Sequence, residues 1–188
     1  MRTFRPALIL DAAAMLAGCG DHNLVVKVDV LSFMDPNLTQ FSIGPVPPLP
    51  EGLYTGEQTI VKDANVNLVE GTSGVAEVRN VSLAITTLAS DSTGAGTDTL
   101  RLYMSDLNSD PLTTAPVLVL PIDFSPGTTQ TMHAETVGDS RIAGLFSGNQ
   151  VKVTLTTAAR GPQGGDPLNA RVQLTQLDAV VIGGRKAL

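Results

Sequence analysis

The stretch Leu24-Val25-Val26-Lys27-Val28-Asp29-Val30 has an apolar residue at every second position, and its two charged residues fall on the positions between them. Successive side chains of a β-strand point to opposite faces, so a period of two predicts a strand with one buried face. We therefore expect a half-buried strand immediately after the N-terminal segment.

The same alternation returns through the rest of the chain and predicts about eight strands in all. It is clearest over residues 60–68, 81–85, 100–104, 118–124, 151–155 and 172–181. Pro121 cannot donate to a strand ladder, so its strand is expected to lie at a sheet edge or to end there. In the last stretch the apolar phase shifts by one residue at Thr175-Gln176, which is what a β-bulge produces.

One short helix is expected near residue 142. Asp139 or Ser140 can cap its N-terminus, and Gly148 can end it. Its apolar face follows helical spacing, at Ile142, Leu145 and Phe146. A helix of this length would cover an open end of the sheets.

Segments rich in Gly, Pro, Ser, Thr and Asp separate the predicted strands and indicate loops. They cover residues 44–52, 91–96, 105–116 and 161–167. The prolines of the first segment could set off an N-terminal hairpin over 24–43, which is too short to build a core of its own.

We therefore predict one domain over 24–188, an all-β antiparallel β-sandwich with about eight strands and one short helix. Both an immunoglobulin-like and a jelly-roll type fit this pattern. The chain has no Trp and a single Cys, so the usual immunoglobulin markers are missing. The order of the strands stays open at this point.

Composition excludes several classes of protein. With 43% hydrophobic and 16% charged residues, the 188-residue chain is too apolar to be disordered. Its net charge of −6, without a basic cluster, argues against a nucleic-acid partner. The single Cys excludes a disulfide framework within the chain and a zinc site built on several thiolates.

The N-terminal segment is typical of a secretory signal peptide. A short start with two arginines precedes a mostly apolar run, which ends in small residues. The run ends with Leu16-Ala17-Gly18-Cys19, which resembles the lipobox of bacterial lipoproteins at all four positions. Asp11 departs from the usual apolar run, because an acidic side chain costs free energy on entering a membrane.

This resemblance implies that a diacylglyceryl group is attached to the thiol of Cys19 and that residues 1–18 are removed. Residues 19–23 would then be the lipidated Cys and a short tether to the domain. Gly20 stands where Asp would mark retention at the inner membrane, so the resemblance favours the outer membrane of the cell envelope. No other stretch is apolar for long enough to span a bilayer.

Groups able to perform catalysis are scarce. The two histidines are His22, in the tether, and His133, expected on a strand or at its end. His133 could serve as a base beside a Ser or Thr, but the chain has no nucleophile turn of the Gly-x-Ser-x-Gly type. We expect a hydrogen-bonded surface histidine, no enzyme activity and no cofactor.

The loop Asp106-Leu107-Asn108-Ser109-Asp110 resembles the first half of a calcium loop, because three oxygen ligands alternate along it. The second half does not follow the pattern: Pro111 stands where Gly is needed, and Val117 stands where a bidentate Glu is needed. A solvated turn is the favoured interpretation.

Two functional hypotheses follow. The first is a non-enzymatic, lipid-anchored accessory or adhesion-like module that presents a surface near the membrane, with an envelope protein as a possible partner. The second is an extracytoplasmic ligand-binding domain, for glycan or calcium, or a hydrolytic domain. Exposed aromatics commonly bind sugars, and Tyr54 and Tyr103 are the only tyrosines available.

Overall fold

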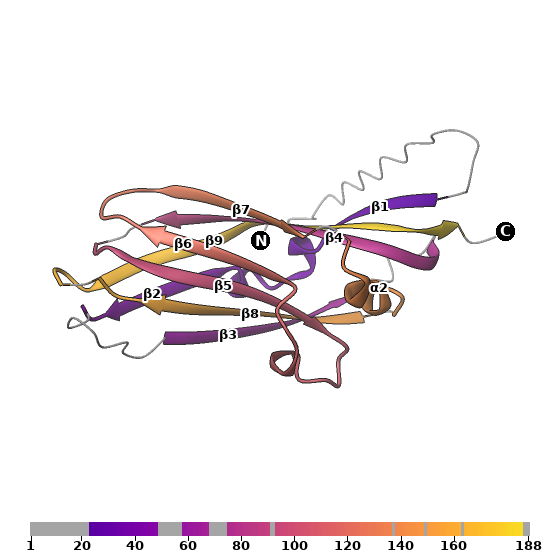
Figure 1. Ribbon diagram of the computed structural model, residues 1–188, viewed down its shortest axis with the longest axis horizontal. Coiled ribbons are helices and arrows are strands. Elements are labelled where there is room, and N and C mark those ends of the chain that lie inside the picture. The colour runs from indigo at the N-terminus through magenta and orange to yellow at the C-terminus, as the bar shows by residue number, and fades with distance from the viewer. Residues whose placement is uncertain are drawn as a thin grey trace, which may run out of the picture.

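The computed structural model describes residues 23–48, 58–67, 75–90, 93–136, 138–148, 150–162 and 164–185. Two antiparallel sheets pack face to face, with one short helix at one end (Figure 1). The strands are β1 (Asn23–Asp29), β2 (Gln40–Val46), β3 (Gln58–Asn67), β4 (Val75–Ser90), β5 (Gly96–Ser105), β6 (Leu118–Phe124), β7 (Gln130–Thr136), β8 (Gln150–Arg160) and β9 (Leu168–Arg185). The helix is α2 (Ser140–Phe146), and the 3-10 turns are η1 (Leu31–Phe33), η2 (Pro36–Leu38) and η3 (Pro111–Thr113).

The strand order is that of a jelly roll. The five-stranded sheet has the order β1-β9-β4-β7, with β2 also paired to β9, and the four-stranded sheet has the order β3-β8-β5-β6. The antiparallel pairs are β2–β9, β3–β8, β4–β7 and β5–β6, and each pair lies inside the previous one in the sequence. This is the pairing of a jelly roll, in which one long hairpin folds over to form two sheets. The predicted antiparallel β-sandwich is confirmed, in its jelly-roll form.

The core lies between the two sheets and is built from the predicted alternating positions. In β5 and β6, for example, Leu100, Leu102, Leu120 and Ile122 are all at most 3% exposed. Full burial of one such side chain contributes about 1.5–3 kcal/mol. The largest fully buried side chains are Phe41, Leu83, Ile85, Leu100, Leu102, Ile122, Ile142, Phe146, Leu155, Leu168 and Leu174.

Strand β8 departs from the simple alternation, because Thr154 and Thr156 are buried although they lie on its outer face. β8 is a central strand, paired with β3 on one side and β5 on the other. The longer side chains of Tyr103 and Arg101 stand directly opposite these threonines on β5. A small side chain between larger cross-strand neighbours loses its exposure even on a solvent face.

Two local predictions about the strands are confirmed. β9 shifts register against β4 between the pairs Thr86–Gln176 and Thr87–Leu174, so Thr175 is the extra residue of a β-bulge. β6, which contains Pro121, is an edge strand of the four-stranded sheet. Proline has no backbone N–H, and on the open side of an edge strand no neighbouring strand needs that donor.

The predicted helix is also confirmed. The carboxylate of Asp139 accepts a hydrogen bond from the Arg141 backbone N–H at 2.9 Å and so caps the first turn. Ile142 and Phe146 are buried in the common core, and the Gly148 N–H donates to the last turn of the helix. The helix thereby covers the end of the sandwich beside β4.

The expected N-terminal hairpin over 24–43 is wrong. β1 and β2 do not pair with each other; β1 pairs with residues 178–184 of β9, and β2 pairs with residues 168–173. An 18-residue strand offers an edge long enough for both. The loop predicted over 44–52 also begins later than expected, because β2 continues through Pro45 to Val46.

Several sequence predictions fall outside the described residues. These include the signal peptide over 1–18, Cys19, the tether as far as His22, Leu68 at the end of a predicted strand, and Tyr54. No helix within the described ranges has the length and apolarity needed to cross a bilayer.

Candidate functional site

A row of hydrogen-bonded polar side chains crosses the outer face of the five-stranded sheet. We call this set the polar row; its members are Lys27 on β1, Asp178 and Gln176 on β9, Thr86 on β4, and His133 and Glu135 on β7. The sheet register brings these side chains together, because Thr86 stands opposite both His133 and Gln176.

The buried end of the polar row is the carboxylate of Asp178, whose side chain is only 10% exposed. It accepts from Lys27 Nζ at 2.8 Å and from Gln176 Nε2 at 2.5 Å. The hydrogen bond and charge of Asp178 raise the pKa of Lys27. With its amide nitrogen directed at Asp178, Gln176 presents its carbonyl oxygen to Thr86, 3.1 Å away.

The exposed end of the polar row contains the predicted His133, which lies on β7 as expected. Its Nδ1 lies 3.0 Å from Thr86 Oγ1, and its Nε2 lies 2.9 Å from Glu135 Oε1. The side chains of His133 and Glu135 are 48% and 61% exposed. A contact this exposed contributes little to stability, about 0–1 kcal/mol.

Carboxylate, imidazole and hydroxyl in sequence are the groups that activate a nucleophile in triad enzymes. Here the direction of the hydrogen bonds opposes that chemistry. Thr86 has one hydroxyl proton, and it is donated to the Gln176 carbonyl, which can only accept. Thr86 must then accept from His133, so this imidazole is not placed to remove the hydroxyl proton.

A buried carboxylate lies elsewhere, in the core. Asp98 on β5 is 1% exposed and points inward between the sheets with Leu100 and Leu102. Its Oδ1 accepts from the backbone N–H groups of Thr99 at 2.7 Å and Ala158 at 2.8 Å. Its Oδ2 is buried and has no hydrogen-bond partner in the described part of the chain.

Burial raises the pKa of Asp98 to about 6, although the two backbone hydrogen bonds act in the opposite direction. The signal for this residue was present in the sequence. Asp98 has the same strand phase as Leu100, Leu102 and Met104, and that phase faces the core.

The carboxylates of the loop over 106–110, for which the sequence favoured a turn over a calcium site, accept hydrogen bonds from their own turns. Asp106 accepts from the Asn108 backbone N–H at 3.0 Å and from the Ser109 hydroxyl at 2.7 Å. The hydrogen bond from Ser109 is the main reason why the pKa of Asp106 is lowered. Asp110 separately accepts from the Leu112 N–H at 3.0 Å and caps η3. The loop therefore consists of two successive capped turns.

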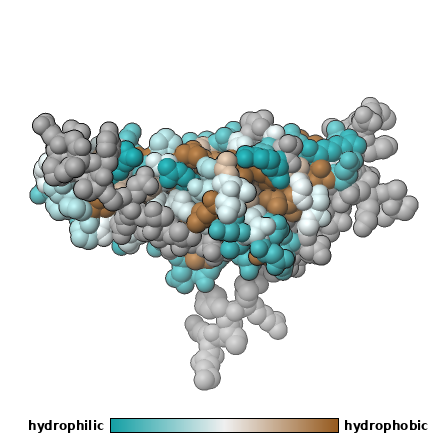
Figure 2. All heavy atoms as spheres, turned by 60° about the horizontal axis from the view of Figure 1, so that its bottom comes forward, coloured by the Kyte–Doolittle hydropathy of each residue, from teal (hydrophilic) through white to brown (hydrophobic). Residues whose placement is uncertain are grey.

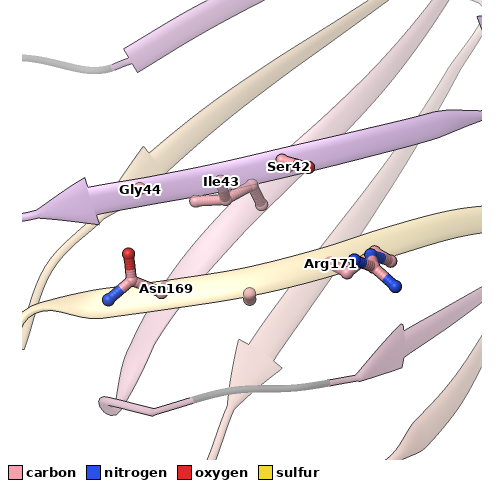
Figure 3. Close-up of a pocket in the computed structure, with 6 residues that line it drawn as sticks. Ser42, Ile43, Gly44, Asn169 and Arg171 are labelled. Atoms are coloured by element: carbon pink, nitrogen blue, oxygen red, sulfur yellow. The ribbon is translucent and has the colours of Figure 1, made fainter.

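A shallow depression of about 250 Å³ lies between β2 and β9 (Figure 3). Ser42, Ile43 and Gly44 line it from β2, and Asn169 and Arg171 from β9. It occurs where the two strands lose register after Ile43. Gly44 has φ +105°, and a Cβ there would collide with the Leu168 carbonyl, so the irregular backbone accounts for this feature.

Other candidates are weaker. Tyr103 is half-buried beside Thr154 and does not project as a stacking platform. Within the described ranges, no three His, Cys, Asp or Glu side chains are grouped as metal ligands. On the face shown in Figure 2, apolar side chains form separate patches among polar ones.

Comparisons of the chain with known proteins found structural similarity but no sequence match. No protein-family model and no curated sequence matches it. A viral particle of infectious bursal disease virus superposes with a TM-score of 0.48 at 19% identity, over 96% of this chain and 36% of that one. Particles derived from the same virus give 0.48 at 18% identity, and its Gt strain gives 0.46 at 17% identity over 43% of that chain. The chain thus spans less than half the length of these viral chains.

Proposed function

We propose that the mature chain is a lipid-anchored, non-enzymatic accessory or adhesion-like module of the bacterial cell envelope, held at the outer membrane. The observation that carries this proposal is the Leu16-Ala17-Gly18-Cys19 sequence placed four residues before β1 begins at Asn23. An extended chain spans at most about 3.6 Å per residue, so the domain would start within about 14 Å of its lipid.

The polar row supports a role in display rather than in catalysis. It lies on a sheet face, and its hydroxyl is committed to Gln176. Such a face, carried close to the membrane, suits contact with another envelope protein. The row includes both signs of charge, in Lys27 and Glu135, which suits a complementary polar partner.

Replacing the anchoring residue tests this proposal directly. In Cys19→Ser cells we expect uncleaved precursor or soluble protein, because no thiol remains to accept the diacylglyceryl group. The native chain should sediment with membranes and yield an N-terminal peptide whose mass includes lipid. Mature Cys19→Ser protein that stays membrane-bound would refute the anchor. Cross-linking in intact cells should recover a partner from the native chain and lose it in the variant.

A hydrolytic role is the second candidate, and the contact of His133 with Thr86 is the observation in its favour. If it were correct, His133→Ala would abolish turnover of a generic ester such as p-nitrophenyl acetate by the purified protein. We expect no turnover above buffer from either protein, because the Thr86 proton is held by Gln176.

A further inference from the structure

The end of the five-stranded sheet where β1 begins carries an apolar pair, the exposed Val25 and the half-buried Ile182. Val25 is 60% exposed, more than Phe33, Leu107, Leu112 and Val119, the other exposed large hydrophobic side chains whose burial is described. It stands directly opposite Ile182 of β9, and both belong to the outward-facing phase of their strands. Neither side chain is needed in the core, where Val28 and Val181 supply the inward positions.

A cationic side chain lies across the same corner. Arg79 of β4 reaches over β9 and donates from Nη1 to Asn23 Oδ1 at 2.9 Å. The Arg79 guanidinium passes over Gly184, because a Cβ atom added at Gly184 would lie 3.8 Å from Arg79 Nη2. Glu77 lies 3.6 Å from Arg79 Nε, and the Arg79 side chain remains 51% exposed.

We call the group Asn23, Val25, Arg79, Ile182 and Gly184 the anchor-side corner. The start of β1, the end of β9 and the start of β4 meet there, at the right of Figure 1. Apolar side chains beside an arginine are what a protein surface needs at a membrane interface, where the tails accept the apolar part and the headgroups accept the charge.

We propose that the anchor-side corner docks onto the lipid bilayer, with Val25 and Ile182 at the acyl boundary and Arg79 on headgroup phosphates. This inference rests on the proposed lipidation of Cys19. Val25 is six residues from that Cys, so it cannot lie more than about 22 Å from it along the chain. A tether this short keeps the local concentration of lipid at the corner high, which favours the bilayer over a diffusing protein as occupant.

The absence of tryptophan from the chain allows a direct test. Val25→Trp places a single indole at the corner, and Val119→Trp is the matched control. Val119 is 47% exposed and lies on β6, on the outer face of the other sheet. Each lipidated protein is purified from membranes and reconstituted into phosphatidylcholine–phosphatidylglycerol vesicles, with and without bromine on the acyl chains.

We expect brominated lipid to quench Val25→Trp roughly twofold or more while leaving Val119→Trp unchanged, because an interfacial side chain reaches the upper acyl region. Adding Arg79→Gln should reduce the quenching of Val25→Trp. Equal quenching of both probes, or of neither, would overturn the docking. If Val25→Trp does not fold, as judged by circular dichroism, Ile182→Trp reports on the same corner with the same two outcomes.

The mass of the N-terminal peptide separates the two proposals. A lipid-bearing Cys19 with an unquenched corner probe overturns only the docking and leaves the anchor intact. An unmodified Cys19 overturns the proposed function, and the docking with it.

Discussion

Replacing Asp98 by asparagine should change how stability depends on pH. The carboxyl of Asp98 is 1% exposed, and burial raises its pKa to about 6 in the folded chain, against an ordinary value of 3.8. The fold therefore favours the protonated acid. Below pH 3.8 the group is protonated in both the folded and unfolded states and has no differential effect. Between pH 3.8 and about 6 the unfolded state ionises while the folded state stays protonated, so the folded state loses stability over this range, and the loss is complete above about 6.

The size of this loss follows from the two pKa values. Each unit of difference between the folded and unfolded pKa values corresponds to about 1.4 kcal/mol. Asp98 should therefore lower the free energy of unfolding by about 3 kcal/mol between pH 3.5 and 7.5. The amide of the Asp98→Asn variant would keep an acceptor for the Thr99 and Ala158 N–H groups but cannot ionise. The cost of burying this amide is the same at every pH, so it cancels in the comparison.

The assay is urea unfolding of the native chain and Asp98→Asn at both pH values, followed by far-ultraviolet circular dichroism. The stability of Asp98→Asn relative to the native chain should rise by about 3 kcal/mol from the lower to the higher pH. Asp106→Asn is the control with opposite sign, because hydrogen bonding lowers the pKa of Asp106 and its contribution is lost as the pH falls. A difference that stays within about 1 kcal/mol across the range would refute a buried Asp98 with a raised pKa.

Three further outcomes are expected. Ile85→Ala should lower the free energy of unfolding by about 2–5 kcal/mol in urea denaturation, because Ile85 is 0% exposed at the centre of the core; a loss below about 1 kcal/mol would contradict that packing. Asp139→Ala should cost about 1 kcal/mol in the same assay through loss of the α2 cap, and Asp139→Asn, which can still cap, should cost less. Thr86→Val should break the polar row at its centre yet change stability by less than about 1 kcal/mol, because the row is partly solvated, while any cross-linked partner bound to that face should be lost.

Much of the fold could be predicted from local patterns. A period of two reports which side of a strand is buried, and it does so without knowledge of the partner strand. The phase shift at Thr175-Gln176 marked the bulge, and Pro121 marked an edge strand, because each is a property of one strand. Asp98 could have been identified in the same way, from the buried phase it shares with Leu100.

The candidate site could be predicted only in part. His133 was identified as a hydrogen-bonded strand residue, but Thr86 lies 47 positions before it, and Gln176 lies 90 positions after Thr86. Periodicity contains no information about which strand lies beside which. Hydrogen bonds across β7, β4 and β9 arise from that pairing, so the polar row could not be seen in the sequence.

By itself the sequence determined the all-β class, the inward faces of the strands, the bulge and the short helix, because each depends on residues close together in the chain. Tertiary structure alone decided that β1 and β2 both pair with β9, that Thr86 meets His133, and that Val25 faces outward beside Ile182 and Arg79. These contacts depend on strand order and register, which are set by the packing of the whole sandwich rather than by any one segment.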